Sequence, residues 1–125
     1  MLNLHLDYID EAFDERGVIS GVKLHCPDNY NFAFDVVDRV AEHEGSKTAM
    51  MWANDKGEEK RFTFADMKKY SDKAANYFLS LGIKKGDRVM LILKRHYQFW
   101  YALLGLHKIG AIAIPATNLL TAKDI

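Results

Sequence analysis

The segment that decides the fold covers residues 82–118 and reads GIKKGDRVMLILKRHYQFWYALLGLHKIGAIAIPATN. Its first apolar run, Val89–Leu93, shows no alternation, which is typical of a strand covered on both faces of a parallel sheet. Residues 97–109 are apolar almost all round and precede Gly110, a pattern that predicts a buried helix ended by a glycine. Ala111–Ile114 supplies a second short strand. The segment therefore predicts an α/β protein that contains a right-handed βαβ unit.

Ligands of such sheets bind beyond the carboxyl ends of the strands. In this chain those ends are Lys94-Arg95-His96 after the first strand and Pro115-Ala116-Thr117-Asn118 after the second. Both are polar exits from apolar strands, so both are candidate ligand sites. The alternative is ordinary loop chemistry, in which Asn118 or Thr121 caps a final helix that begins near Thr121.

A first helix is predicted upstream, capped by Asn31 and ended by Gly45. Its core face is expected to contain apolar residues at helical spacing. The charged residues between them are expected to form a solvated face. The expected core residues are Ala33, Val36, Val37, Val40 and Ala41, and the expected solvated residues are Asp35, Asp38, Arg39 and Glu42.

A β-hairpin and a second helix follow. The strands Thr48–Ala53 and Glu58–Phe62 surround an Asn-Asp-Lys-Gly turn, which favours a hairpin. Thr63 and Asp66 then have the spacing of a capping box. The helix that starts there has apolar residues every three or four positions and should end at Gly82.

Residues 1–28 are expected to form an N-terminal arm, distinct from the α/β region at residues 29–125. Tyr8, Ile9, Ala12 and Phe13 lie at helical spacing, which predicts a short amphipathic helix up to Arg16-Gly17. Two glycines and a proline then predict an extended segment that lies across a larger body.

Composition excludes several classes of protein. The chain has 125 residues, and its 17 basic and 17 acidic side chains cancel. Without a basic stripe we expect no nucleic-acid partner, and no apolar run approaches the ~20 residues that span a membrane. The single cysteine, Cys26, fits a reducing compartment. With no signal peptide at the start, the expected location is the cytoplasm.

A search for catalytic residues finds none. The five histidines are far apart and lack the i, i+4 pairing of a helical metal site, so we expect no metal ligands. Cys26 has no base near it in sequence. The glycines match neither phosphate-loop pattern, and Lys84-Lys85-Gly86-Asp87 is expected to be a solvated turn.

The order of these elements resembles a known family. Asn31-Phe32-Ala33 at a helix start, a hairpin, and Phe62-Thr63-Phe64 at the next helix come first. The block from Leu81 to Val89, which reads LGIKKGDRV, and the Lys108–Ile112 block before Pro115 follow. Together they resemble the amino-terminal end of the AMP-forming acyl-CoA synthetases, in the adenylate-forming ligase superfamily. Within this superfamily the residues quoted most resemble those of the acetyl- and medium-chain acyl-CoA synthetases. The resemblance covers about residues 29–125.

The resemblance implies a ligase of fatty acid metabolism that uses ATP, Mg²⁺ and CoA. ATP and a carboxylate form an acyl-adenylate and pyrophosphate, and the CoA thiol then displaces AMP to give a thioester. The loop after the second strand lies near the CoA entry in relatives, which implies a CoA-side role for Thr117, Asn118 and Leu119. Some relatives have an aromatic-Gly-Gly sequence there, which this chain lacks. The family's phosphate loop, aromatic-x-x-Thr-Glu segment, ribose-binding Asp and catalytic Lys are absent from these 125 residues.

Two readings of the chain follow. The first is the truncated N-terminal subdomain of such a ligase, inactive alone and without cofactors of its own, whose partner is the rest of the synthetase. The second is a stand-alone, non-catalytic interaction module derived from the same family. The sheet has only two central strands, fewer than doubly wound sheets normally have. Since strand edges and apolar faces are left uncovered, we expect the chain to self-associate.

Overall fold

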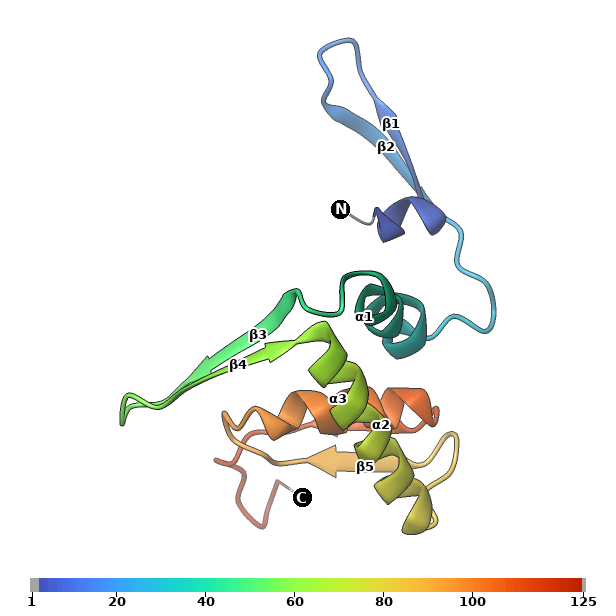
Figure 1. Cartoon of the computed structure of the whole chain (residues 1–125). Coiled ribbons are helices and arrows are strands. Elements are labelled where there is room, and N and C mark those ends of the chain that lie inside the picture. Colours follow the sequence, from blue (N-terminus) through green and yellow to red (C-terminus); the bar gives the residue numbers. More distant parts are fainter. Residues whose placement is uncertain (1–2, 125) are drawn as a thin grey trace. The chain divides into compact units, whose positions relative to one another are not determined.

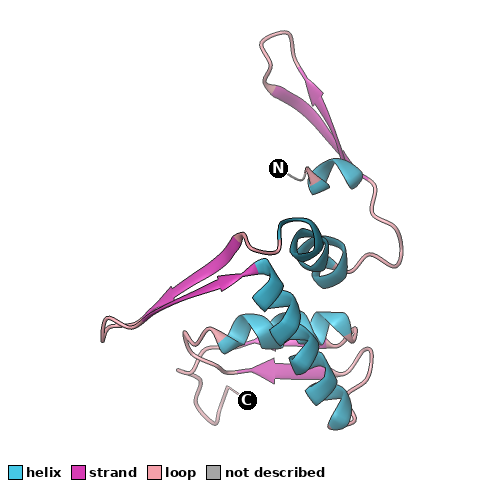
Figure 2. Ribbon diagram, viewed as in Figure 1, coloured by secondary structure: helices cyan, strands magenta, loops and turns pink. Residues whose placement is uncertain are grey.

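The structure is a computed structural model that describes residues 3–124. The chain divides into two compact units, the first up to Tyr30 and the second from Asn31 onward. Figure 1 shows the chain coloured in sequence order with most of its helices and strands labelled, and Figure 2 distinguishes the helices from the strands. The second unit contains every candidate site residue.

The first unit is a β-hairpin. A single 3-10 turn, η1 (Leu4–Asp7), precedes β1 (Ile9–Phe13), which pairs antiparallel with β2 (Ile19–Leu24). The short amphipathic helix predicted from Tyr8 to Arg16 is therefore wrong.

Turn chemistry explains why the hairpin forms. The Asp14 carboxylate accepts hydrogen bonds from the backbone N–H groups of Arg16 and Val18, both at 2.9 Å. Gly17 adopts a φ of +75°, a left-handed conformation that glycine adopts without steric cost. An aspartate-nucleated turn with a glycine suits a hairpin, and it outweighs the weak helical spacing of four apolar residues.

The second unit begins with a helix of mixed geometry. Its first part, η2 (Ala33–Asp38), is π-helical, and it continues as α1 (Arg39–Glu44). The Asn31 side chain accepts a hydrogen bond from the Ala33 N–H at 3.0 Å, as a capping residue does. The Asn31 N–H in turn donates to the Asp35 carboxylate at 2.6 Å. The predicted start of this helix is confirmed, and Ala33 and Val37 are buried as expected.

The solvated charged face predicted for this helix is wrong at Asp38, which is 3% exposed. Both carboxylate oxygens of Asp38 accept hydrogen bonds from Lys108 Nζ, at 2.8 and 2.9 Å. Lys68 Nζ also donates to Asp38 at 2.8 Å, and Lys108 Nζ reaches Asp72 at 2.6 Å. Because a buried carboxylate is tolerated only when it is paired, two lysines from distant helices stabilise Asp38 in the interior.

The next elements agree with the sequence. β3 (Thr48–Ala53) pairs antiparallel with β4 (Glu59–Thr63), and α2 (Phe64–Ser80) follows. Thr63 Oγ1 accepts from the Asp66 N–H at 3.2 Å, and the Asp66 carboxylate accepts from the Thr63 N–H at 3.0 Å. The predicted hairpin and capping box are confirmed.

The βαβ unit consists of β5 (Arg88–Leu91), α3 (Gln98–Lys108) and β6 (Ile112–Pro115). The two strands pair parallel, with Arg88 opposite Ile112 at one end of the ladder. β5 ends two residues earlier than predicted. The protein is thus an α/β protein, with three two-stranded sheets within residues 3–124.

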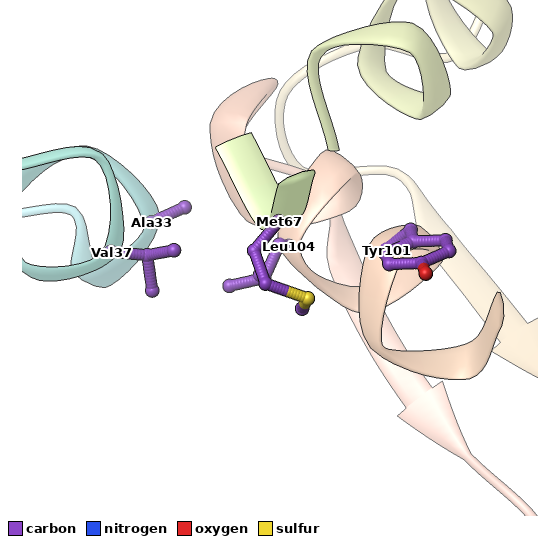
Figure 3. Packing of buried hydrophobic residues seen from close by; sticks show 5 residues of the cluster. All are labelled: Ala33, Val37, Met67, Tyr101 and Leu104. Atoms are coloured by element: carbon purple, nitrogen blue, oxygen red, sulfur yellow. The ribbon is translucent and has the colours of Figure 1, made fainter. Parts of the chain in front are cut away.

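Helix α3 contributes residues to two hydrophobic clusters. In the first, Ala33 and Val37 of η2 face Met67 of α2 together with Tyr101 and Leu104 of α3 (Figure 3). The second cluster contains three buried residues, Leu91, Leu106 and Ala111.

The contact between α2 and α3 is close because Gly105 has no side chain. A Cβ at this position would lie 2.8 Å from Ala74 Cβ and 2.9 Å from the Ala75 backbone nitrogen. Trp100, on a different side of α3, is 50% exposed. The apolar sequence predicted a helix buried on all sides, and this prediction is wrong on the side of Trp100. The described elements cover only part of the circumference of α3.

The chain beyond β6 forms turns. The Asp124 carboxylate accepts hydrogen bonds from the Thr121 N–H at 2.7 Å and from the Thr121 hydroxyl at 2.8 Å. The predicted capping interaction is present, but no helix follows it up to residue 124, the last that the structure describes.

Candidate functional site

A cavity of about 490 Å³ lies at the carboxyl end of β5. Its walls come from the exit of β5, from the loop after β6, and from the end of β3 with the turn that follows. The lining residues are Trp52, Ala53, Asn54, Asp55, Lys94, Arg95, His96 and Asn118. The cavity therefore brings together Lys94-Arg95-His96 and Asn118, which the sequence placed at two separate strand ends.

The loop after β5 has a constrained backbone. Lys94 has a φ of +45°, the only positive φ of a non-glycine residue among residues 3–124. Such a conformation is uncommon for a lysine, and strained backbone of this kind is concentrated at functional sites. The Trp52 indole N–H donates to the Arg95 carbonyl at 2.8 Å, and the His96 N–H donates to the Leu93 carbonyl at 3.1 Å. These bonds hold the loop while its three side chains stay exposed.

The three residues predicted after β6 lie in different surroundings. Asn118 lines the cavity, whereas Thr117 and Leu119 do not. The Thr117 hydroxyl accepts a hydrogen bond from the Leu119 N–H at 3.2 Å, which orders the turn. The Leu119 side chain is 80% exposed. The structure thus places one of the three at the cavity and the other two in the adjoining turn.

Sequence reasoning missed the wall contributed by the β3–β4 hairpin. Asn54 was identified only as part of a turn, and its side chain does serve that turn by accepting from the Lys56 and Glu58 N–H groups, both at 3.0 Å. About 40 residues separate this turn from Lys94-Arg95-His96 in the chain. The Trp52-to-Arg95 hydrogen bond joins the two segments, and no local sequence pattern predicts it.

The chemistry available in the cavity is that of hydrogen-bond donors. Lys94 and Arg95 provide cationic groups, Asn118 provides an amide and His96 an imidazole, while Asp55 adds one carboxylate. Such a set suits an anionic or strongly polar ligand. A second cavity, of about 320 Å³, uses the same loop and adds the aromatic rings of Phe99 and Trp100.

An apolar groove of about 450 Å³ lies elsewhere on the second unit. It is bordered by β3, α2, α3 and the start of η2, and its only strongly polar side-chain groups are the indole N–H groups of Trp52 and Trp100 and the imidazole of His107. Burial lowers the pKa of His107 below its usual value, which favours the neutral imidazole. The lining residues are Phe32, Val37, Ala49, Met50, Met51, Trp52, Phe64, Met67, Trp100, Leu103, Leu104 and His107.

The part of the chain that the structure describes has neither a candidate metal site nor a membrane-spanning helix. No group of three or more His, Cys, Asp and Glu side chains within residues 3–124 is placed to hold a metal ion. None of the helices in that range is long and apolar enough to cross a membrane.

A comparison with protein families matches residues 37–125 to the AMP-binding enzymes. The match covers more than half of the chain. The chain belongs to the AMP-binding enzyme family.

Similar curated proteins within this family are acyl-coenzyme A synthetases. The mitochondrial synthetase ACSM5 of Rattus norvegicus is 36% identical over 123 residues, which are 94% of this chain and 21% of that protein. The mitochondrial synthetase ACSM3 of Homo sapiens is 38% identical over 109 residues, 82% of this chain and 19% of that protein. The chain thus spans about a fifth of the length of the curated relatives it matches.

Solved structures of adenylate-forming ligases share the fold. A fatty acid AMP ligase from Legionella pneumophila is 27% identical with a TM-score of 0.67. The match covers 73% of this chain and 16% of the ligase chain. The inhibitor-bound N-terminal domain of FACL13 from Mycobacterium tuberculosis is 28% identical with a TM-score of 0.67, covering 75% and 23%. These neighbours confirm the resemblance stated from the sequence and the α/β class of the N-terminal region.

Proposed function

We propose that the chain is the N-terminal part of an ATP-dependent carboxylate–CoA ligase that forms an acyl-adenylate and then an acyl-CoA thioester. The observation that carries this proposal is the match of residues 37–125 to the AMP-binding enzymes, together with 36% and 38% identity to two acyl-CoA synthetases. A similar Legionella pneumophila ligase, 28% identical with a TM-score of 0.64, was solved in complex with acyl adenylate and pyrophosphate.

In this proposal residues 29–125 are a truncated subdomain that carries no catalytic residue, and residues 1–28 are an arm. ATP, Mg²⁺, CoA and the carboxylate are ligands of the complete ligase, and the remainder of that ligase is the partner of this chain. The proposed substrate-side residues are Thr117, Asn118 and Leu119 toward CoA and Lys94, Arg95 and His96 at the strand end. The shared cavity of Asn118 and Lys94-Arg95-His96 supports this grouping.

The role of the strand-end residues follows from charge. CoA and ATP carry phosphates, which lysine and arginine side chains bind through charge-assisted hydrogen bonds. The Trp52-to-Arg95 hydrogen bond fixes the backbone from which these side chains project. The chain would accordingly orient a phosphorylated ligand, while bond making and breaking occur on other parts of the ligase.

Two activity assays test the proposal. The isolated chain should show no carboxylate-dependent ATP–pyrophosphate exchange. A chimera in which this chain replaces the matching fifth of the rat synthetase ACSM5 should release AMP in the presence of ATP, carboxylate and CoA. Exchange by the isolated chain, or a folded chimera without activity, would contradict the proposal.

A matched pair of variants in the chimera tests the site residues. Arg95→Ala should raise the KM for CoA or ATP because it removes a cation from the cavity. Arg61→Ala removes a cation from β4, away from the cavity lining, and should leave both KM values unchanged. Equal effects of the two substitutions would remove the strand-end loop from the proposed site.

The alternative, a non-catalytic interaction module, is favoured by the apolar groove of about 450 Å³. The reading frame beyond residue 125 discriminates between the two functions. A continuation that carries the family's Ser/Thr/Gly-rich loop ending in Lys supports the ligase, whereas a stop codon supports the module.

A cytoplasmic location is part of the same proposal and rests on the single cysteine. The names of the curated relatives include the word mitochondrial. Fractionation of cells that express a tagged full-length protein decides between these locations.

A further inference from the structure

The apolar groove runs along the outer edge of β3. Four consecutive residues of this strand, Ala49–Trp52, line the groove. Successive side chains of a strand point to opposite faces, so a cavity that touches consecutive residues follows the edge of the strand as well as one face. Large apolar side chains border it and are exposed, with Met51 at 63%, Trp100 at 50% and Phe32 at 48%.

The edge of β3 also carries backbone groups that point away from its partner strand. Within residues 3–124, β3 pairs with β4 and with no other strand. The Asn54 N–H donates to the Glu58 carbonyl of the hairpin at 3.1 Å. Because hydrogen-bonding direction alternates along an antiparallel strand, the N–H and C=O groups of Met51 and Ala53 point outward, beside the groove.

β3 differs from the other strands in carrying no charged residue or proline along its edge, and its pairing with β4 has an irregularity between Thr48 and Met50. Proteins protect exposed edge strands with charged residues or proline. Each of the other five strands in the described part of the chain contains a charged residue or a proline. The sequence of β3, TAMMWA, contains neither. An uncharged strand of six residues, of which Thr48, Met51 and Ala53 are exposed, is a surface suited to pairing with another strand.

We propose that this edge is a dimerisation surface on which β3 of a second copy of the chain binds antiparallel. The pairing is self-complementary about a twofold axis, since each strand offers the other the same outward groups of Met51 and Ala53. It brings no like charges together because β3 is uncharged. The product is a four-stranded sheet in the order β4-β3-β3-β4, in which the partner's strand lies beside the groove.

Energetic reasons favour this arrangement. A two-stranded hairpin is marginally stable by itself, and four strands with an apolar face are sufficient for a stable sheet. Pairing joins the outward backbone groups of the two copies by hydrogen bonds and removes apolar surface of Met51 from water. Dimerisation is independent of the proposed ligase activity, so it can fail without affecting that proposal.

A proline substitution tests the backbone pairing directly. Met51→Pro removes one outward N–H and leaves the inward groups that bind β4 in place. The matched control is Arg61→Pro, because Arg61 lies directly opposite Met51 in the hairpin and its N–H points outward from β4. Light scattering over a wide concentration range should show a dimer for the unmodified chain and for Arg61→Pro. Met51→Pro should weaken the dimer about tenfold or more.

Amide hydrogen exchange on the unmodified chain gives a second readout that needs no substitution. Protection of the Met51 and Ala53 amides should rise with protein concentration, while that of the Arg61 amide stays constant. A single-chain mass at every concentration, equal effects of the two prolines, or concentration-independent exchange at Met51 and Ala53 would each overturn the proposal.

Discussion

Asp38 shows how a single charged residue can organise the interior of a small unit. Its side chain is 5% exposed, and the side chain of its partner Lys108 is 3% exposed. Lys108 lies 70 residues further along the chain, at the end of α3, and Lys68 contributes from α2. The three charges tie the first helix to both later helices, which hydrophobic contacts alone would orient less specifically.

Replacing Asp38 should therefore be costly. Asp38→Asn leaves the buried ammonium of Lys108 poorly compensated and should lower the free energy of unfolding by about 3–5 kcal/mol. Asp72→Asn is the control, because Asp72 is 45% exposed and the loss should be about 1 kcal/mol or less. Urea denaturation measures both. A second substitution, Lys108→Met, in the Asp38→Asn chain should recover part of the loss, and an Asp38→Asn loss under about 1 kcal/mol would contradict the assigned role.

Tyr101 also has a buried polar group, but this group lacks the partners that Asp38 has. Its hydroxyl is the one buried side-chain polar atom without a hydrogen-bond partner within residues 3–124, and burial raises its pKa. Since an unpaired buried hydroxyl is destabilising, Tyr101→Phe should leave stability unchanged or raise it by about 1 kcal/mol. Tyr97→Phe is the control, because the Tyr97 hydroxyl accepts a hydrogen bond from Lys60 at 3.0 Å and its removal should cost stability. Thermal unfolding compares them, and a clear loss for Tyr101→Phe would show that its hydroxyl has a partner.

At the scale of the element, helix α2 begins with a capping box that depends on pH. Hydrogen bonds from the Thr63 N–H and hydroxyl lower the pKa of Asp66 below the usual 3.8. Because the pKa is lower in the folded chain, the stabilisation is fully present above pH 3.8 and is lost as the pH falls through the folded value.

Asp66→Asn should accordingly lower the free energy of unfolding by about 0.5–2 kcal/mol at neutral pH, and the difference from the unmodified chain should shrink below about pH 4. Asp124→Asn is a close control, because Asp124 makes the same two hydrogen bonds to Thr121, where no helix follows within the described residues. A pH series of urea denaturations would measure both. A difference for Asp66→Asn that stays constant down to pH 3 would contradict the assignment.

At the scale of the whole molecule, some surfaces of the second unit are packed against neighbouring elements and others are exposed. Two hydrophobic clusters hold η2, α2, α3 and the parallel strands together. The edge of β3 and the exposed side of Trp100 remain uncovered among the described residues. The self-association expected from the sequence remains a prediction. A comparison of Met51→Pro with Arg61→Pro would test whether it occurs at the edge of β3.

Local sequence determined the elements of the second unit. The Thr63–Asp66 spacing, the Asn-Asp-Lys-Gly turn and the glycines at 82 and 110 act within a few residues, so their effects are readable from the chain itself. The order of these elements, with the residues at their boundaries, was also sufficient to indicate the ligase family. The first unit was misread because helical spacing and turn chemistry compete within the same short segment.

Tertiary structure alone decided what depends on distant partners. The burial of Asp38 requires lysines 30 and 70 residues away, and the exposure of Trp100 depends on which elements cover α3. The cavity joins Lys94-Arg95-His96 to Asn118 and to a hairpin wall held by the Trp52-to-Arg95 hydrogen bond. A sequence records each residue's own preference, whereas pairing a buried charge or closing a cavity depends on which segments the fold brings together.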